Sequence, residues 1–467
     1  MDDGGVKPAA VEAIPLAVER LRRSFASGRM RPLTYRLEQL SRLERLLKDC
    51  EPEICQAIRK DLGRSELETR IIETSLLERE LASAQKHLRK WAKPERVRVP
   101  WLIQPSAARV CREPFGVVLI MGPWNYPLQL VLLPLVGALA AGNCAVIKPS
   151  ELAPATSSFL AAALPRYLDT ECIQVIEGGA CEATALLAER FDYIFFTGNS
   201  RVGRIVLEAA AKHLTPTTLE LGGKSPCIVD RSANLRSSAR RIMWGKLLNA
   251  GQVCVAPDYV LVDESVENRL LTHMAEAVKE FLGERPRTSP DFARIVNRRH
   301  FQRLLGLIQG GGQIFAGGEA CEDELYLAPT ILTRTPPDAA VMQEEVFGPI
   351  LPVLSVKSVD EAINFVSQRE KPLALYVFAE DERVQRQVIS GTSSGAVAVN
   401  YPCLHAALSC LPFGGVGSSG MGAYHGRATF ETFSHRKSVF LKASWPDVSI
   451  AYPPLSRLKE RIVRKLM

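Results

Sequence analysis

The chain has 467 residues, 46% of them hydrophobic and 23% charged, which is the composition of an ordinary soluble globular protein. This length allows roughly two to four domains and a core large enough to contain a catalytic cleft. The net charge of +7 is too small to indicate a nucleic-acid partner, and the sequence contains no zinc-finger or RNA-recognition motif.

The numbers and spacing of cysteines and histidines narrow the class of protein further. The 11 cysteines include no Cys-x-x-Cys pair and no regular framework, and the charged N-terminal segment lacks a secretory leader. These features predict reduced thiols in a cytoplasmic protein. The 7 histidines show no ligand spacing, so we expect no metal.

The first part of the chain predicts helices followed by an arm. Residues 11–90 carry leucines every three positions, as at Leu37, Leu40 and Leu43, which favours helices. The next stretch, 91–112, is extended and interrupted by proline, so we expect a hairpin or arm there.

From residue 116 the chain alternates between predicted strands and helices. Short apolar runs predict buried strands at 116–121, 144–148, 173–176 and 193–197. Helices are expected between them, at 128–141 and 155–168, the first being too short to span a bilayer. Strands that alternate with such helices predict a parallel sheet.

The same alternation resumes after Glu220. Strands are predicted at 227–229 and 259–262, with a helix at 240–249 between them, and together they indicate a second α/β domain. A last strand, 438–442, follows helical residues near Thr429.

Two motifs offer a nucleophile and a base. Cys254 follows Gly251-Gln-Val at a predicted helix end, and a thiol attacks a carbonyl only as a thiolate, which requires an electropositive setting. Glu220 ends a predicted strand and precedes Leu-Gly-Gly-Lys224; a buried carboxylate at such a place can activate water. Taken alone, these motifs fit a structural cysteine and a solvated turn glutamate better.

A third motif, Pro123-Trp-Asn-Tyr-Pro127, lies where the first parallel strand ends and a helix begins. Ligands bind at the carboxyl ends of strands in doubly wound sheets. The amide of Asn125 could donate to a developing oxyanion there. The two prolines are equally consistent with a stiff turn.

The remaining motifs suit a dinucleotide. Phe196-Thr-Gly-Asn-Ser-Arg-Val-Gly203 reads as strand, glycine turn and helix N-terminus, which favours a pyrophosphate, although its glycines do not form a Gly-x-Gly-x-x-Gly fingerprint. Lys148 and Glu151, at another strand end, suit a ribose diol. Glu345 and Phe347 could hold a sugar and flank a planar ring; a helix end with a core phenylalanine explains them equally well.

Taken together in their order along the chain, these motifs resemble the aldehyde dehydrogenase superfamily, from about residue 15 to residue 454. The segments 209–216, 257–259 and 412–422 resemble its class 3 branch. That resemblance implies homodimers and medium- or long-chain or aromatic aldehyde substrates.

The resemblance also implies a role for each matched residue. The catalytic groups are Cys254 as nucleophile, Glu220 as base, and Asn125 as oxyanion donor together with the backbone N–H of Cys254. The cofactor-binding residues are Lys148 and Glu151 at the adenosine ribose, Gly198 and Gly203 at the pyrophosphate turn, and Glu345 and Phe347 at the nicotinamide ribose and ring. The substrate funnel is lined by Trp244, Asn400 and Phe413.

The chain departs from the family pattern near the substrate. Val253 stands where a hydroxyl residue is common beside the nucleophile. Ala396 and the segment 400–405 differ from the usual glycine-rich substrate loop, which leaves the chain-length preference open.

The implied fold is α/β, with a Rossmann-like parallel-sheet cofactor domain and an α/β catalytic domain. The cofactor domain spans 1–92 and 113–221, and the catalytic domain spans 222–428. A small strand-based oligomerisation arm comprises 93–112 and 429–445, and a basic tail occupies 446–467.

The implied reaction is oxidation of aldehydes to carboxylic acids with NAD or NADP. It passes through a thiohemiacetal and a thioester on Cys254, and water activated by Glu220 hydrolyses the thioester. Glu151 should repel a 2′-phosphate and favour NAD unless its side chain swings away. Two alternatives remain open: a relative that passes the thioester to coenzyme A and does not need Glu220, and a non-enzymatic structural, crystallin-like protein.

The tail allows two interpretations. Leu455, Leu458, Ile462 and Leu466 fall on one helical face with lysines and arginines around it, and a basic amphipathic helix can make a peripheral membrane contact. A solvated or dimer-contacting tail is the favoured alternative. The sequence has no terminal Cys-a-a-X motif for prenylation.

Overall fold

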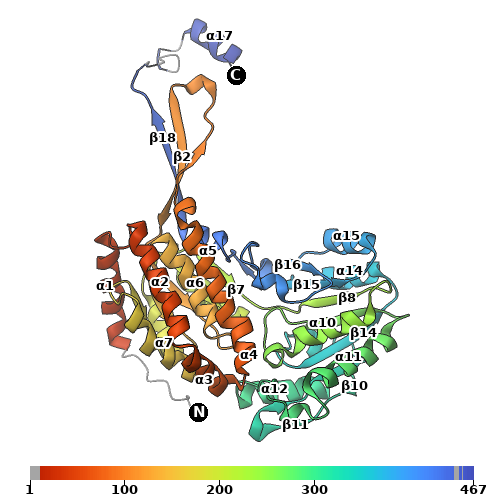
Figure 1. The fold of residues 1–467 in the computed structure, drawn as a ribbon. Helices are drawn as coiled ribbons and strands as arrows, with labels where there is room; N and C mark the ends of the chain where they lie inside the picture. The colour runs from red at the N-terminus through yellow and green to blue at the C-terminus, as the bar shows by residue number, and fades with distance from the viewer. Residues whose placement is uncertain (1–10, 446, 448–451, 455, 467) are drawn as a thin grey trace.

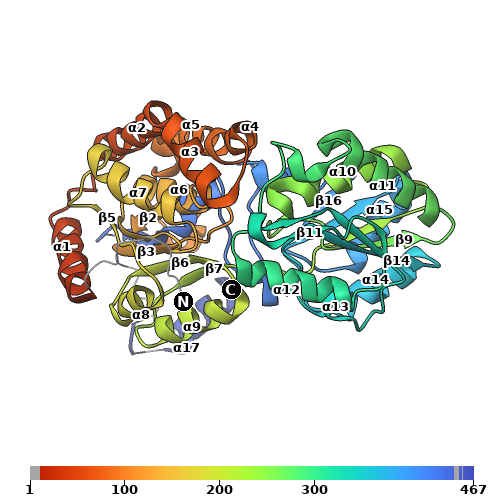
Figure 2. The same cartoon turned by 90° about the horizontal axis from the view of Figure 1, so that it is seen from below.

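The computed structural model describes residues 11–445, 447, 452–454 and 456–466. Two sheet-containing bodies lie side by side, and a long arm projects from the first of them (Figure 1). Seen from below, helices cover both faces of each central sheet (Figure 2). The α/β fold predicted from the sequence is therefore confirmed.

The first body is built on a six-stranded sheet of order β17-β7-β6-β3-β4-β5. Its strands are β3 (Val117–Met121), β4 (Cys144–Lys148), β5 (Ile173–Val175), β6 (Tyr193–Thr197), β7 (Thr217–Glu220) and β17 (Gly420–Met421). All pairings are parallel except that of β17 with β7. Every residue of β3, β4 and β6 is buried, because helices cover both faces, and this explains the continuous apolar runs.

The helices of this body are α1 (Ile14–Ala26), α2 (Leu33–Asp49), α3 (Glu51–Leu62), α4 (Glu66–Thr69), a π-helical turn η2 (Arg70–Thr74), α5 (Ser75–Trp91), α6 (Gln129–Ala141), α7 (Pro154–Tyr167), α8 (Ala180–Ala188), α9 (Ser200–Ala211) and α16 (Arg427–Thr432). Residues 420–421, which the sequence-based division puts in the segment 222–428, pair with β7 at the edge of this sheet.

The second body contains a seven-stranded sheet of order β10-β13-β14-β9-β8-β15-β16 and a small hairpin. The strands are β8 (Pro226–Val229), β9 (Tyr259–Asp263), β10 (Gln313–Ala316), β11 (Ala320–Cys321), β12 (Tyr326–Leu327), β13 (Thr330–Thr333), β14 (Ile350–Val356), β15 (Ala374–Phe378) and β16 (Ala396–Val399). Its helices are α10 (Leu235–Leu247), α11 (Glu267–Leu282), α12 (Arg298–Gln309), α13 (Ala340–Gln343), α14 (Val359–Ser367) and α15 (Glu382–Gly391).

The helix predicted at 240–249 differs from the one observed. It begins at Leu235, because the Asn234 side chain accepts a hydrogen bond from the N–H of Ser237, 3.2 Å away. It ends at Leu247 because Asn249 and Ala250 adopt left-handed backbone angles with φ of 48° and 52°. No glycine marks those two positions, so the sequence did not reveal this end.

The arm is a three-stranded antiparallel sheet of β1 (Glu95–Val97), β2 (Ser106–Pro114) and β18 (Ser434–Lys442). The final strand is longer than the predicted 438–442 because all nine residues of β18 pair with β2. A terminal helix, α17 (Arg457–Leu466), lies near the far end of the arm (Figure 1). Leu455, predicted to share its apolar face, lies outside the described residues.

Candidate active site

Cys254 lies on a short loop that follows α10. Asn249 and Ala250 form a left-handed turn after this helix, and Gly251 continues it with φ of 76°. A Cβ atom on Gly251 would lie 2.2 Å from the carbonyl oxygen of Gly348, so only glycine allows this close approach. Cys254 follows this turn; it is partly exposed and its thiol is free.

The thiol borders a mainly apolar cavity of about 510 Å³. Aromatic and aliphatic side chains surround it, including those of Tyr126, Trp244, Leu248, Phe413 and Tyr424. Arg70, Ile71 and Arg79 from η2 and α5 also line it. An apolar cavity with few polar groups suits an organic substrate with a single polar end.

Electrostatics around Cys254 keep the resting thiol protonated. Burial raises the pKa of Cys254, and the nearby carboxyl groups of Glu345 and Glu220 raise it further. Formation of the thiolate therefore requires a compensating positive charge or an acceptor for the proton.

Glu220 ends β7, and both of its carboxyl oxygens are buried without a hydrogen-bond partner among the described residues. Burial raises the pKa of Glu220 well above its usual range. Backbone contacts hold Glu220 on two sides. Gly420 pairs with it in the neighbouring strand, and the backbone carbonyl of Glu220 accepts from the N–H of Gly198 at 3.0 Å. Once ionised, a buried carboxylate with a raised pKa is a stronger proton acceptor than a solvated one.

Asn125 lies in the loop between β3 and α6 and is buried. Its amide nitrogen donates to the carbonyl oxygen of Gln252 at 3.0 Å. Its own carbonyl oxygen accepts from the Asn249 side chain, also at 3.0 Å, and from Arg64. The structure thus brings this loop directly against the loop of the predicted nucleophile.

The residues predicted to bind the cofactor begin at the carboxyl end of β4, with Lys148 and Glu151, and continue at the start of α9 after β6. The Lys148 ammonium donates to the Pro149 carbonyl at 2.9 Å and lies 3.5 Å from the Glu151 carboxylate. Burial lowers the pKa of Lys148. Gly198 and Gly203 flank the start of α9, where Asn199 accepts from the N–H of Val202 at 3.0 Å.

Glu345 lies against the glycine turn that follows β7, and the Phe347 ring lies 5.3 Å from that of Trp124, centroid to centroid. A Cβ atom on Gly222 would lie 2.0 Å from the Glu345 carboxylate, so this glycine makes room for it. Burial and the nearby Asp258 carboxylate together raise the pKa of Glu345 to about 8. One oxygen of Glu345 is buried without a partner among the described residues, and a ribose hydroxyl fits such an orphaned acceptor.

Not all of the residues predicted for the substrate funnel line the cavity. Trp244 and Phe413 line the cavity with Cys254. Asn400 does not: its side chain accepts from the N–H of Ala379 at 3.0 Å and donates to the carbonyl of the same residue at 3.1 Å. Because both ends of its amide bind the end of β15, Asn400 holds neighbouring strands together.

Sequence reasoning overlooked the role of Lys224. Its ammonium donates to the carbonyls of Val341 and Glu344 at 2.7 and 2.8 Å and pairs with Asp258. Asp258 in turn accepts from the N–H of Val346 at 3.0 Å. The lysine of the Glu220 motif therefore fixes the segment that carries Glu345.

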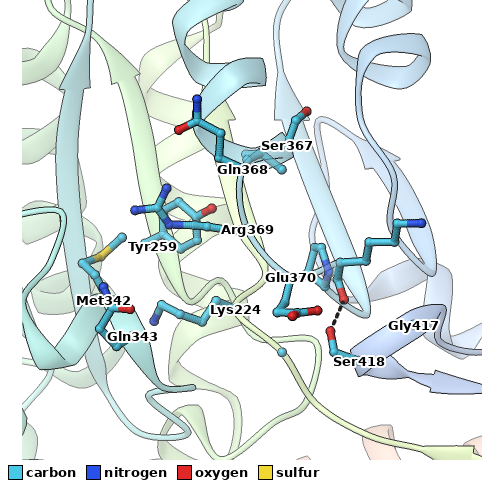
Figure 3. A pocket seen from close by; sticks show the side chains of 14 residues that line it. Lys224, Tyr259, Met342, Gln343, Ser367, Gln368, Arg369, Glu370, Gly417 and Ser418 are labelled. Atoms are coloured by element: carbon cyan, nitrogen blue, oxygen red, sulfur yellow. Dashed lines mark hydrogen bonds between the residues drawn. The ribbon is translucent and has the colours of Figure 1, made fainter.

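A second, larger cavity of about 720 Å³ adjoins Lys224, which points toward Met342 and Gln343 in its wall (Figure 3). It is lined by polar side chains such as Gln368 and Ser418. Cys254 is absent from its lining residues, so the smaller, apolar cavity is the one associated with the predicted chemistry.

Comparisons with known proteins show the family to which the chain belongs. The aldehyde dehydrogenase family model matches residues 4–439, and the chain belongs to that family. It is an NAD(P)-dependent aldehyde dehydrogenase and an oxidoreductase with a Rossmann-like cofactor fold.

Its relatives include members of family 3, in agreement with the predicted branch. Mouse aldehyde dehydrogenase family 3 member A2 is 51% identical over 95% of this chain and 92% of its own length. Rat family 3 member B1 is 47% identical over 96% of each chain. Among solved structures, Staphylococcus aureus AldH in a substrate-bound state superposes with a TM-score of 0.95 at 43% identity, covering 97% of this chain and 99% of that one.

An indole-3-acetaldehyde dehydrogenase in complex with NAD+ is also similar. Its TM-score is 0.86 at 27% identity, covering 94% of this chain and 90% of that chain. Within the described part of this chain, no helix has the length and apolar character needed to cross a membrane.

Proposed function

We propose that the enzyme oxidises apolar aldehydes through a thioester on Cys254 that is hydrolysed by water. The observation that carries this proposal is the position of a free thiol on the wall of an apolar cavity, beside a loop whose amide donor is Asn125 and near the buried carboxyl of Glu220.

In the first step, the Cys254 sulfur attacks the aldehyde carbon and gives a thiohemiacetal. The oxygen of the former carbonyl gains negative charge, which the Asn125 amide and the backbone N–H of Cys254 stabilise. One such donor contributes about 3–4 kcal/mol in other enzymes. The thiol proton must leave, and the carboxyl groups near Cys254 are candidates to receive it.

The nicotinamide cofactor, when bound, supplies the hydride acceptor for the oxidation, a chemistry that side chains cannot perform. Lys148 and Glu151 would hold one ribose and Glu345 the other, with Gly198 and Gly203 at the pyrophosphate and Phe347 at the ring. The orphaned oxygen of Glu345 and the glycine turn before α9 fit these groups.

In the last step, Glu220 takes a proton from a water molecule that attacks the thioester carbonyl. The carbon–sulfur bond breaks, the carboxylic acid leaves, and Cys254 is restored. Overall, one aldehyde, one water and one oxidised cofactor give one acid, one reduced cofactor and one proton.

The cavity favours medium- or long-chain aliphatic or aromatic aldehydes, because its wall is mainly apolar and burying such chains releases water from apolar surface. We propose a homodimer in the cytoplasm. The edge strand β18 and exposed apolar residues of the arm support an interface there, including Phe440, Leu441 and Trp445, the last 82% exposed. Peripheral membrane contact through α17 is the competing use of the tail.

The test is absorbance of reduced nicotinamide with NAD or NADP and aldehydes from short aliphatic to long-chain and aromatic. We expect reduction with at least one cofactor and a rate that rises with apolar length. Cys254→Ala should abolish turnover and retain cofactor binding. Turnover in that variant would overturn the assignment, and no reduction in the wild type with any pair would favour the non-enzymatic alternative.

A further inference from the structure

A buried ion pair next to the active site has no part in the chemistry described above. Arg64 lies between α3 and α4, and Glu73 lies in the π-helical turn η2. Both side chains are 0% exposed. Removing two charges from water costs several kcal/mol per ion unless further hydrogen bonds compensate. The other hydrogen-bond partners of Arg64 and Glu73 therefore show which segments the ion pair holds in place.

Glu73 binds the end of the loop that carries Asn125. One of its oxygens pairs with Arg64, and the other accepts from the N–H groups of Leu128 and Gln129, both at 2.9 Å. These N–H groups lie at the start of α6, where a helix leaves its donors without internal partners. The carboxylate therefore anchors the loop where the helix begins.

Arg64 binds the same loop at its centre. Its guanidinium donates to the carbonyl oxygen of Asn125 and lies 4.7 Å from the centroid of the Tyr126 ring. The planar group also donates to the side-chain oxygen of Asn249 at 3.3 Å. One cation thus contacts both the loop after β3 and the turn after α10.

Asn249 extends the contact to the nucleophile. Its amide nitrogen donates to the carbonyls of Asn125 at 3.0 Å and Gln252 at 3.3 Å. Its backbone N–H donates to Glu68 at 2.7 Å. The left-handed turn before Cys254 is consequently held by the same cluster that holds Asn125.

We propose that Arg64 and Glu73 are positioning residues that set the Asn125 donor against the Cys254 loop. The proposal rests on the roles of Asn125 and Cys254 given above. Asn125 belongs to the first body and Cys254 to the second, so the distance between donor and nucleophile depends on a connection between them. A misplacement of about 1 Å at a reacting centre can cost on the order of 100-fold in rate.

The test is a double-mutant cycle between Arg64→Lys and Asn125→Ala, measured as kcat with saturating aldehyde and cofactor. Lysine keeps the charge but has no planar fork, so it cannot reach Glu73, Asn125 and Asn249 together. We expect Arg64→Lys to lower kcat about 10- to 100-fold while the KM for the cofactor stays within about twofold. We expect the double variant to be no more than about threefold slower than Asn125→Ala alone, because residues that act through one another are not additive.

The matched control is Arg36→Lys. Arg36 is also buried and donates to three carbonyls, those of Met30, Arg31 and Ala140 at 2.7, 3.0 and 3.2 Å. It lies on α2, away from both loops. Its substitution should lower the melting temperature by a similar amount, and its effect on kcat, if any, should multiply with that of Asn125→Ala.

Each outcome has a distinct meaning. If the fold-losses of kcat in Arg64→Lys and Asn125→Ala multiply in the double variant, or if Arg64→Lys leaves kcat unchanged, the positioning role is wrong while the proposed mechanism stands. If Asn125→Ala itself keeps the wild-type kcat, the role of Asn125 fails and this proposal fails with it. Should Arg64→Lys not fold, Glu73→Gln provides the second cycle, since it keeps one acceptor for the N–H groups of α6 and weakens the hold on Arg64.

Discussion

The side-chain amide of Asn125 donates to the main-chain carbonyl of Gln252, two residues before Cys254, at 3.0 Å. This bond joins a loop of the six-stranded sheet to the loop that follows α10 of the second body. In the proposed mechanism, this placement preorganises the neutral amide donor beside Cys254 to stabilise the oxyanion.

Asn125→Ala should lower kcat by about 10²–10³-fold, because one oxyanion donor is lost. Asn125→Asp should be slower still, since a carboxylate repels the developing negative charge. Steady-state kinetics with saturating cofactor would measure both variants. Equal kcat in Asn125→Ala and wild type would contradict the role.

Glu220→Gln should lower turnover about 10²–10⁴-fold by removing the general base. Reduced nicotinamide should then appear as a burst of about one equivalent per site, followed by a slow phase, because the thioester persists. Stopped-flow absorbance would record both phases. Glu80→Gln is the matched control, a buried carboxyl on α5 outside the site. Unchanged thioester release in Glu220→Gln would favour an acyl-transferring enzyme.

The wild-type rate should rise with pH. Burial raises the pKa of Glu220 well above its usual range, so the base is protonated and inactive at low pH and becomes active as pH increases through that raised value. The raised pKa of Cys254 acts in the same direction. A kcat profile that falls between pH 6 and about pH 8 would contradict this sign.

Glu80 should make stability decrease with pH. Burial raises the pKa of Glu80 to about 7, from an ordinary 4.5, so the folded state holds its proton more tightly than the unfolded chain. Ionisation of buried Glu80 therefore lowers the free energy of unfolding. This loss is absent below about pH 4.5, grows as the pH rises toward 7, and reaches about 3 kcal/mol above that. Glu80→Gln keeps an acceptor for the Gly426 N–H without the charge. It should therefore raise the melting temperature at pH 8 more than at pH 5, and equal shifts at both values would count against this account.

Trp244→Ala should alter chain-length preference. The indole lines the cavity beside Cys254 and lies 5.5 Å from the Tyr401 ring, centroid to centroid. Each methylene of the substrate that the wall no longer covers loses about 0.8 kcal/mol of burial free energy. We therefore expect kcat/KM to fall about tenfold for long-chain aldehydes and less for short ones. Trp91→Ala is the control, because Trp91 packs on Phe430 outside the cavity. A uniform loss across chain lengths would exclude a role in selection.

Glu151→Gln should shift cofactor preference toward NADP. The Glu151 carboxylate is 44% exposed and lies 3.5 Å from the Lys148 ammonium. Removing its charge removes the repulsion of a 2′-phosphate and leaves Lys148 to attract it, so KM for NADP should fall while KM for NAD rises. The ratio of the two KM values measures this, with the exposed Glu208→Gln on α9 as control. An unchanged ratio would remove Glu151 from the ribose site.

Local patterns predicted the framework of the first body and the first two strands of the second, β8 and β9, but not the later strands and helices of the second body. The buried strands 117–121, 144–148 and 193–197 were visible as apolar runs, since helices cover both faces of their sheet. The helix end before Cys254 was not visible, because its left-handed residues are Asn249 and Ala250 rather than glycine. The strand β17 was missed because two residues, Gly420 and Met421, carry no periodicity.

By itself the sequence determined the α/β class, the family and the identity of the candidate nucleophile, base and oxyanion donor, because motifs and apolar periodicity are local. The tertiary structure decided which residues lie together: Trp244 and Phe413 beside Cys254, Asn400 bound instead to Ala379, and Arg64 joining Asn125 to Asn249. These hydrogen bonds join residues 21 to 185 positions apart, so they form only when packing fixes the separation of the partners. A buried charge is stable only where such partners converge.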